Sequence, residues 1–440
     1  MTIVEFLSNG PATSKQIQSA TGLNQSAVSR QLRALGGRVI KLPRSRSPIY
    51  AITRNAFGSD DNLPLFMVDR LGNTVPVAMV RPLAHGGFYV QPATAFPRVL
   101  AGENGDGLYD DLPYFLQDLR PQGFLGRHVA RELASISDEF PSDPRAWTTN
   151  HIGRYLVSNG DDLPGNFKLG YHTYLRLRRP PIACGIDEYP SISQRVLNGQ
   201  SLGSSAGGEQ PKFTAFSKER AEHVIVKFSP ATNDPIAMRW RDILITEYHA
   251  TATLREALLP AAQTRLIEVG EQFFLESIRF DRCGEYGRLP MISLQAVDSE
   301  YVGLGENWAK IMWQLDKLGL VNDKHAIDAE VLWHFGRLIN NTDMHLGNLS
   351  LGIEGDVFRL LPAYDMCSMG FAPTNIGVRP FEFSPPVLSD SDLVSNLAGS
   401  NISVDSVEEL AHEFWARVGA DYRISGEFKA FILNEGLGKR

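Results

Sequence analysis

Two short strings in the last third of the chain hold side chains that suit magnesium-dependent phosphoryl transfer. Asp343 and Asn348 lie in NTDMHLGNLSL (341–351), and Asp365 lies in LLPAYDM (360–366). Asp343 and Asn348 are five residues apart, a spacing that places a carboxylate and an amide in one loop. The apolar run after Asn348, the turn GIEGD and the run VFRLLPA predict a hairpin that returns Asp365 beside Asn348. Because Mg²⁺ prefers oxygen ligands and a nucleophilic hydroxyl needs a proton acceptor, we expect Asp343 to act as the base and Asn348 and Asp365 to bind the metal.

A glycine- and serine-rich segment earlier in the chain is suited to binding phosphate. It reads GSSAGGEQPKF and runs into an expected strand. Successive backbone N–H groups in such a loop can form a nest for an anion, and glycine lets the backbone approach phosphate closely. Alone this is a weak signal, because Gly-Gly turns between strands are common. The residues assigned to nucleotide binding here are Ser205, Ala206, Gly207, Gly208, Glu209, Gln210 and Lys212.

The next expected strand, HVIVKFSP, places Lys227 behind that loop. Val224 and Val226 alternate with less buried positions, as in a strand with one buried face. An ammonium group at this place can bind the α- and β-phosphates of a nucleotide. Twenty residues on, the helical segment WRDILITEYHATATLREAL carries Glu247, which is expected to pair with Lys227. The alternative for Glu247 is a surface carboxylate on an amphipathic helix.

Two further strands, TRLIEVG and QFFLESIRFDR, predict a hairpin that ends where a hinge between two lobes would lie. The backbone of Ile278, Arg279 and Phe280 is assigned to adenine at this hinge. His345 and Tyr364 complete the assigned nucleotide site, although His345 is equally suited to bracing its own loop. Glycine loop, lysine strand, helix, hairpin, hinge, helices, catalytic loop and metal aspartate follow the serial order of a two-lobed kinase.

Composition separates a basic beginning from an acidic remainder. The chain has 440 residues, enough for two or three domains, and its 43% hydrophobic and 21% charged content is that of a soluble globular protein. Residues 1–55 hold eight Lys and Arg but one acidic residue, so this segment carries +7 and the remainder carries −14. The basic segment is therefore expected to meet a polyanion. Three scattered cysteines, no secretory leader and no long apolar run predict a cytoplasmic protein that does not cross a membrane.

The basic segment reads as three helices followed by strand, turn and strand, which is the order of a winged helix-turn-helix. Gly22 opens a short turn before the third helix, QSAVSRQLRAL, which has one apolar face and one polar, basic face. A small protein-binding trihelical domain with solvated arginines is the alternative. The residues assigned to DNA contacts, in the third helix and in the wing turn, are Gln25, Ser26, Ser29, Arg30, Arg33, Arg44 and Arg46.

Together, SSAGGEQPKF, VIVKF, IRFDR, NNTDMHLGNLSL and LLPAYDM resemble the HipA-type serine/threonine kinases of bacterial toxin–antitoxin systems. The segment LPYFLQDLRPQG is similar to the helical signature of that family's N-terminal subdomain. The resemblance implies an α+β multidomain protein with a HipA-like, two-lobed kinase fold behind the winged helix. The expected parts are the winged helix (1–55), a HipA N-terminal subdomain (64–180), the rest of the N-lobe with phosphate loop, lysine strand and hinge (181–285), and a mostly helical catalytic lobe (286–440).

The resemblance also implies ATP and Mg²⁺ as cofactors, with Asp343 as proton acceptor and with Asn348 and Asp365 as metal ligands. Members of the family phosphorylate a protein hydroxyl, typically on an aminoacyl-tRNA synthetase, and so arrest growth. Phosphorylation of a serine in the phosphate loop silences them. The matching residue here is Ser205, with Ser204 as a near alternative, and a phosphate at either would repel ATP.

One departure concerns the partner. In the best-known systems a separate antitoxin binds DNA, whereas this chain carries its own helix-turn-helix, as in the single-chain YjjJ-like branch. Whether an additional antitoxin exists is left open, and autoregulation through the fused DNA-binding domain is expected. The predicted function is an ATP- and Mg-dependent serine/threonine protein kinase that acts on a translation-related protein. Two alternatives stay open: a transcriptional regulator whose kinase-like body only senses nucleotide, and a small-molecule phosphotransferase.

Overall fold

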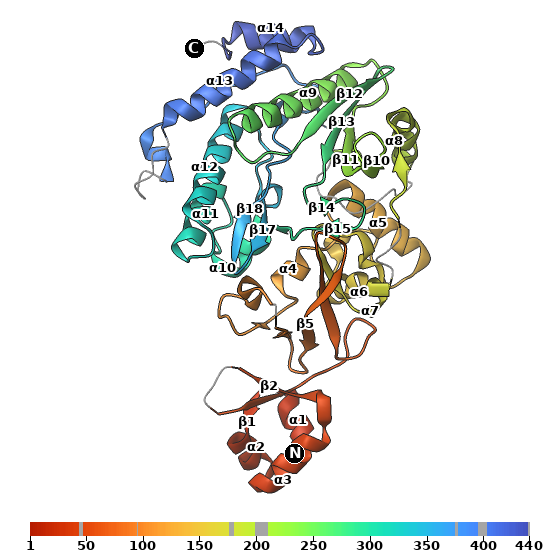
Figure 1. Ribbon diagram of the computed structural model, residues 1–440, viewed down its shortest axis with the longest axis vertical. Helices are drawn as coiled ribbons and strands as arrows, with labels where there is room; N and C mark the ends of the chain where they lie inside the picture. Colours follow the sequence, from red (N-terminus) through yellow and green to blue (C-terminus); the bar gives the residue numbers. More distant parts are fainter. Residues whose placement is uncertain are drawn as a thin grey trace.

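The molecule is elongated, with three small helices at one end of its long axis and the C-terminal helices α13 (Val404–Ala420) and α14 (Gly426–Asn434) at the other (Figure 1). The computed structural model describes residues 1–43, 47–94, 96–175, 180–198, 210–374, 377–394 and 403–438. The expected α+β multidomain class is confirmed. The sites assigned from sequence that lie outside the described residues are Arg44, Arg46, Ser204, Ser205, Ala206, Gly207, Gly208 and Glu209.

The head, residues 1–53, is a helix-turn-helix with a small sheet. Side-chain caps start each helix: Thr2 caps α1 (Ile3–Ser8), Thr13 caps α2 (Ser14–Thr21) and Asn24 caps α3 (Gln25–Ala34). Gly22 ends α2 with a left-handed φ of +71°, which turns the chain toward α3. Strands β1 (Ala12–Thr13), β2 (Val39–Leu42) and β3 (Ile49–Ile52) form an antiparallel sheet in the order β1-β3-β2. The apolar side chains that fill the head are Ile3, Leu7, Ala12, Ile17, Val28, Leu32 and Ile52.

The head is joined to the rest of the molecule by packing and hydrogen bonds. The backbone amide of Arg54 donates to Pro82, and that of Ala84 donates to Ile52. Phe57 is buried and stacks on Phe88 with the ring centroids 5.7 Å apart. The segment after the head is therefore fixed to the body of the protein.

The middle subdomain, residues 63–175, is built on an antiparallel sheet in the order β7-β6-β5-β4-β8, as the alternation after residue 63 predicts. Its helices α6 and α7 pack on β8, while α4 packs on the C-lobe helix α10 (Leu294–Tyr301). Its core is continuous with that of the catalytic part. The elements are β4 (Leu63–Val68), β5 (Thr74–Pro82), β6 (Phe88–Pro92), β7 (Leu108–Tyr109), β8 (Phe167–Leu169), α4 (Tyr114–Gln117), α5 (Gly123–Ile136), α6 (Thr149–Asn159) and α7 (Tyr171–Leu175).

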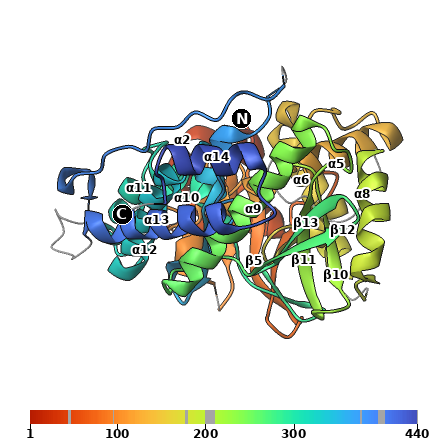
Figure 2. The same ribbon diagram turned by 90° about the horizontal axis from the view of Figure 1, so that it is seen from above.

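The N-lobe is a five-stranded sheet with a helix on each face (Figure 2). Helix α8 (Tyr189–Leu197) covers the face that holds Val224 and Val226, and the longer α9 (Pro235–Glu256) covers the other face. Because strand residues alternate between faces, Lys227 points toward α9. The strand order is β12-β13-β11-β10-β9, with β9 (Ala183–Cys184), β10 (Lys212–Ser217), β11 (Glu222–Phe228), β12 (Thr264–Val269) and β13 (Gln272–Ile278).

The C-lobe combines helices with the hairpin expected after Asn348. Strands β17 (Ser350–Glu354) and β18 (Val357–Leu360) pair in register, and β16 (Ile292–Ser293) adds to β17. Helix α12 runs Asp323–Leu338 and ends just before the loop that holds Asp343, because Asn322 caps its start and Asn340 takes a left-handed φ of +59° after its end. Helix α11 (Trp308–Lys317) packs along it.

Across the described ranges, the chain has no helix that combines the length and the apolar character needed to cross a bilayer.

Candidate active site

The N-lobe contributes a buried ion-pair cluster centred on Lys227. Its Nζ lies 2.6 Å from both carboxylate oxygens of Glu247 on α9 and 2.5 Å from Oδ1 of Asp365. The expected pairing of Lys227 with Glu247 is confirmed, and both side chains are less than a tenth exposed. Since Asp365 belongs to the C-lobe, this cluster links the two lobes.

The charges of Lys227 and Asp365 stabilise each other against burial, whereas burial raises the pKa of Glu247 above its ordinary value. Burial alone would lower the pKa of Lys227, but the carboxylates of Asp365 and Glu247 outweigh it and raise the pKa above its ordinary value. Burial would raise the pKa of Asp365, but Lys227 and Lys212 outweigh it and hold that pKa low. Burial lowers the pKa of Lys212 itself. The cluster therefore holds a charged lysine and an ionised aspartate, the states that suit phosphate and a cation.

The end of α12 sets the catalytic loop through Asn341. The backbone amide of Asp343 donates to Oδ1 of Asn341 over 3.1 Å, and Nδ2 of Asn341 donates to the backbone carbonyl of Asp365 over 3.2 Å. These two hydrogen bonds of the buried Asn341 connect the loop that holds Asp343, the expected base, to Asp365, the expected metal ligand. The sequence pattern did not indicate a role for Asn341. Its position two residues before Asp343 was the available signal.

Within the loop, Asn348 and His345 hold the backbone around Asp343. Nδ2 of Asn348 donates to the carbonyl of Asp343 over 2.7 Å and lies 3.4 Å from its Oδ2. Nδ1 of His345 accepts from the amide of Gly347, and its Nε2 lies 3.7 Å from Oδ1 of Asp343. The Asp343 side chain is 41% exposed, so a protein hydroxyl can reach it.

The hairpin β17–β18 delivers Asp365 to the same place. Asp365 has a left-handed φ of +54°, which bends the chain as it leaves the hairpin. The hydroxyl of Tyr364 donates to the carbonyl of Gly347 over 2.9 Å and pairs with Oγ of Ser350. Tyr364, assigned to nucleotide from the sequence, thus braces the catalytic loop.

Asn348 and Asp365 line one cavity of about 160 Å³ between the lobes. Its wall also contains the middle-subdomain residues Asp118 to Arg120, Gln122 and Pro164. Asp343 and His345 are not part of this wall. Gln210 is buried, and its Nε2 has no hydrogen-bond partner among the residues that the structure describes. The other residues assigned from sequence that line the cavity are Lys212, Lys227, Ile278, Arg279, Phe280 and Tyr364.

The expected hinge is already engaged in the sheet. The backbone amide of Ile278 donates to Gln263, and that of Arg279 donates to His223. A purine that used these two amides would have to replace those partners. The ring centroids of Phe280 and Tyr364 are 5.7 Å apart, and both residues line the cavity.

The donor set of the cavity fits a hard divalent cation. Because Nδ2 of Asn348 is bonded to a carbonyl, its Oδ1 is the amide atom left to face a cation. Asp365 adds an ionised carboxylate in the same wall. Oxygen donors of this kind are those that Mg²⁺ prefers.

The second candidate surface is the outer face of α3. Gln25, Ser26, Arg30 and Arg33 are exposed and Ser29 is partly exposed, while Val28 and Leu32 are buried on the opposite side. Nε of Arg33 donates to the carbonyl of Ser29, which holds this side chain along the helix. The expected division of α3 into a core face and a polar face is confirmed.

Three family descriptions match consecutive parts of the chain. Residues 1–37 match the bacterial regulatory protein, arsR family; residues 59–178 match the YjjJ-like toxin, middle domain; and residues 204–418 match the HipA-like C-terminal domain. The chain is 34% identical to Toxin YjjJ of Escherichia coli (strain K12) over 442 residues, which covers 97% of this chain and 94% of that protein.

Among solved structures, a chain of the Shewanella oneidensis MR-1 toxin–antitoxin complex of HipA, HipB and operator DNA has a TM-score of 0.57. It is 16% identical, and the match covers 84% of this chain and 94% of that chain. This likeness shows the fold, and the 34% identity along nearly the whole chain shows the family. The resemblance stated from the sequence motifs is confirmed. The chain belongs to the YjjJ-like toxins, in which an arsR-type helix-turn-helix precedes a YjjJ-like middle domain and a HipA-like C-terminal domain.

Proposed function

We propose that the protein is an ATP- and Mg-dependent serine/threonine kinase of HipA type that modifies a protein of the translation machinery, such as an aminoacyl-tRNA synthetase. One observation carries the proposal: Lys227 is paired with both Glu247 and Asp365 in the wall of the cavity that also holds Asn348. A phosphate-binding lysine and two oxygen donors for a cation are the parts that phosphoryl transfer requires. The membership of a toxin family supports growth arrest as the outcome.

In this proposal each residue has one task. Asp343, which is partly exposed, accepts the proton of the attacking serine or threonine hydroxyl, while Lys227 and Lys212 compensate the charge of the phosphates. Asn348 and Asp365 would hold Mg²⁺, which supplies charge neutralisation and orientation of the phosphates when bound. Asn341 and Tyr364 keep the base and the cation ligands in register.

The head supports a second part of the proposal, namely that the protein binds operator DNA and regulates its own synthesis. An exposed face with two arginines, a glutamine and serines on α3 can contact phosphates and base edges. The matched arsR-family description concerns regulatory proteins. Silencing through phosphorylation of Ser205 or Ser204 stays a prediction.

The test is a transfer assay with labelled ATP and a cell lysate, comparing the parent with Asp343→Ala. Without its base the variant should lose about 100-fold or more of its transfer rate, yet bind Mg-ATP as the parent does. Glu306→Ala, which removes an exposed carboxylate elsewhere in the C-lobe, should behave as the parent. Equal incorporation by Asp343→Ala and the parent would remove Asp343 from this role.

The same preparation decides between a kinase and a nucleotide-sensing regulator. If the parent protein binds operator DNA in a gel-shift assay, if this binding changes with ATP, and if no phosphate is incorporated, the regulator is favoured. A panel of small alcohols in place of the lysate addresses the small-molecule phosphotransferase.

A further inference from the structure

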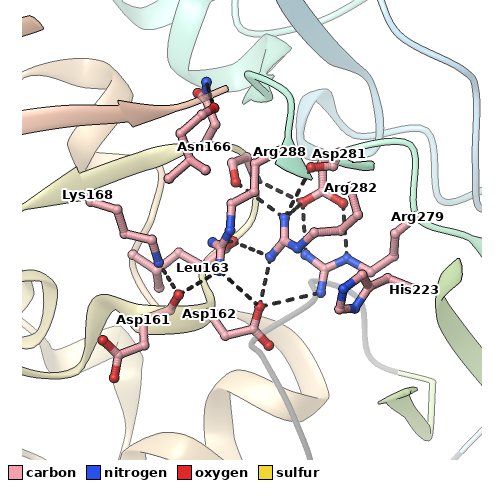
Figure 3. Close-up of polar contacts among 12 residues, drawn as sticks. Asp161, Asp162, Leu163, Asn166, Lys168, His223, Arg279, Asp281, Arg282 and Arg288 are labelled. Atoms are coloured by element: carbon pink, nitrogen blue, oxygen red, sulfur yellow. Dashed lines mark hydrogen bonds and ion pairs between the residues drawn. The ribbon is translucent and has the colours of Figure 1, made fainter. Parts of the chain in front are cut away.

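A second ionic cluster lies where the middle subdomain meets the hinge, and Figure 3 shows it. It is buried except at Asp162, whose side chain is 49% exposed. Three arginines from the segment after β13 gather around two aspartates, one from each side of the junction. We call this set the arginine clasp. Its members are Asp162 of the middle subdomain and Arg279, Asp281, Arg282 and Arg288 of the hinge segment.

Asp162 is the point on which the three arginines converge. Its Oδ1 accepts from Nη2 of Arg282 over 2.8 Å, and it lies 3.9 Å from Nη1 of Arg279 and 3.8 Å from Nη2 of Arg288. Asp281 in turn accepts two hydrogen bonds from Arg279, of 3.0 and 2.8 Å, and pairs with Arg282. The side chains of Arg279 and Arg282 are 4% and 2% exposed, so their charges depend on these partners.

The clasp also fixes the backbone of the middle-subdomain loop. Arg288 donates to the carbonyl of Asp161 over 2.7 Å, Arg282 donates to that of Leu163 over 2.8 Å, and the amide of Gly165 donates to Asp281 over 2.9 Å. Gly165 has a φ of +71°, and a Cβ there would lie 2.9 Å from the carbonyl oxygen of Met291. The loop is therefore pressed against the chain that follows the hinge.

This junction borders the nucleotide cavity. Pro164, from the loop, lines the cavity together with Arg279, Asp281 and Met291. Arg279 thus belongs to two features: its backbone is part of the expected adenine hinge, and its side chain is part of the clasp. Arg279 and Arg282 therefore connect Asp162 to the hinge segment.

We propose that Asp162 is a positioning residue for the nucleotide base: through the arginine clasp it sets where the hinge of residues 278–280 stands in the cavity. The inference rests on the proposed nucleotide-dependent function and adds to it a contribution of the middle subdomain to base recognition. Asp162 does not touch the nucleotide in this proposal. The phosphate end of the site, with Lys227 and Asp365, is attached to other elements and keeps its geometry when Asp162 changes.

The experiment measures binding of two magnesium-loaded probes, ATP and inorganic tripolyphosphate, by calorimetry to the full-length parent and to Asp162→Asn. Loss of one charged hydrogen-bond acceptor should raise the Kd for ATP about tenfold. The Kd for tripolyphosphate, which has no base, should stay within about twofold. Asp162→Glu should recover part of the ATP affinity, since it retains the charge. Asp143→Asn, which changes an exposed aspartate of the middle subdomain paired with Arg145, is the matched control and should leave both constants unchanged.

The outcomes separate the inference from the function on which it rests. A parent that binds neither probe removes the nucleotide site and this inference with it. A parent that binds both, with an Asp162→Asn variant that binds ATP equally well, overturns the inference alone. Equal weakening of both probes, or a lower melting temperature with unchanged ATP affinity, would make Asp162 a purely structural residue and also overturn it. If Asp162→Asn does not fold, Asp162→Glu takes its place under the same criteria, with a smaller expected rise in the Kd for ATP.

Discussion

The Lys227 cluster and the arginine clasp are both ionic and largely buried, but they differ in what their charges face. In the first, Lys227, Glu247 and Asp365 line a cavity, and the cationic groups are lysines. In the second, Asp162 and Arg282 lie outside the wall of that cavity, and Asp281, although it belongs to the wall, accepts from two arginines and a backbone amide. The ammonium group of lysine is compact and can turn toward a phosphate, whereas the planar guanidinium group of arginine fixes the geometry of its hydrogen bonds. The type of cation thus distinguishes a ligand-binding cluster from one that joins two parts of the protein.

The two clusters also connect different parts. Lys227 reaches Asp365 across the two lobes, while the clasp connects the middle subdomain to the hinge. Ion pairs therefore connect the N-lobe to the C-lobe and the hinge segment to the middle subdomain. From this comparison we expect that breaking the first cluster abolishes phosphoryl transfer, and that breaking the second lowers both stability and affinity for the nucleotide base.

The largest effect is expected for Lys227→Ala. It removes the phosphate ligand and leaves the carboxylates of Glu247 and Asp365 buried without their shared partner. Transfer from labelled ATP should fall about 100-fold or more, as when one preorganised charge is removed from a transfer site. Lys218→Ala, which removes an exposed lysine paired with Glu188, is the control and should retain the parent's rate. Activity within a few-fold of the parent's would mean that the Lys227 cluster only connects the two lobes and does not bind phosphate.

The next largest effect is a loss of folding stability in the variant Asp281→Ala. Removing this carboxylate leaves the buried guanidinium groups of Arg279 and Arg282 without a main partner, which should cost about 3 kcal/mol. Urea unfolding followed by far-UV circular dichroism should show an earlier transition for this variant. Asp143→Ala, at an exposed ion pair, should shift it little. An unchanged transition in Asp281→Ala would show that the clasp adds nothing to stability.

Whether a part of the fold or of the candidate site could be predicted depends on how far apart along the chain the interacting residues lie. Asp343, Asn348 and Asp365 lie within 23 residues, and a single hairpin register brings them together, so their spacing was informative. Lys227 and Glu247 were predictable because a strand and the following helix pack directly. The three helices and the hairpin of the head were predictable for the same reason, since caps and turns are local.

The contacts that sequence analysis missed are long-range. Asp162 meets Arg282 across 120 residues, and no pattern near either one indicates the other. Local spacing also left side-chain contacts undetermined. Tyr364 lines the cavity to which it was assigned, but its hydrogen bond to the carbonyl of Gly347 was not indicated by its place before Asp365. Tertiary packing decides the direction in which a side chain points, and the local sequence of one strand or loop does not specify that packing.

A smaller effect, which would sharpen the comparison inside the active site, is expected for Asn341→Ala. Asn341 touches no proposed substrate, but two of its side-chain hydrogen bonds fix Asp343 relative to Asp365. The kcat for transfer should fall about tenfold while the KM for ATP stays near the parent's, because positioning of the base is lost. Thr342→Ala, an exposed neighbour, is the control. A changed KM with an unchanged kcat would instead place Asn341 in nucleotide binding.

The smallest effect concerns Asp242, a buried carboxylate on α9 that accepts hydrogen bonds from the backbone amide and hydroxyl of Ser425. Burial raises its pKa to about 6, although the bonds from Ser425 oppose this. The folded protein therefore binds the proton more tightly than the unfolded chain does, so the contribution of the protonated Asp242 to stability is lost as the pH rises from about 4 through about 6. The melting temperature of the parent, relative to that of Asp242→Asn, should fall between about pH 4 and pH 6. Glu306→Gln should show no such trend. A difference between parent and Asp242→Asn that is constant with pH would mean that Ser425 and the nearby charge of Arg239 keep the carboxylate ionised. In that case a buried carboxylate of this protein would need neither the arginines of the clasp nor the lysine of the active site to stay ionised.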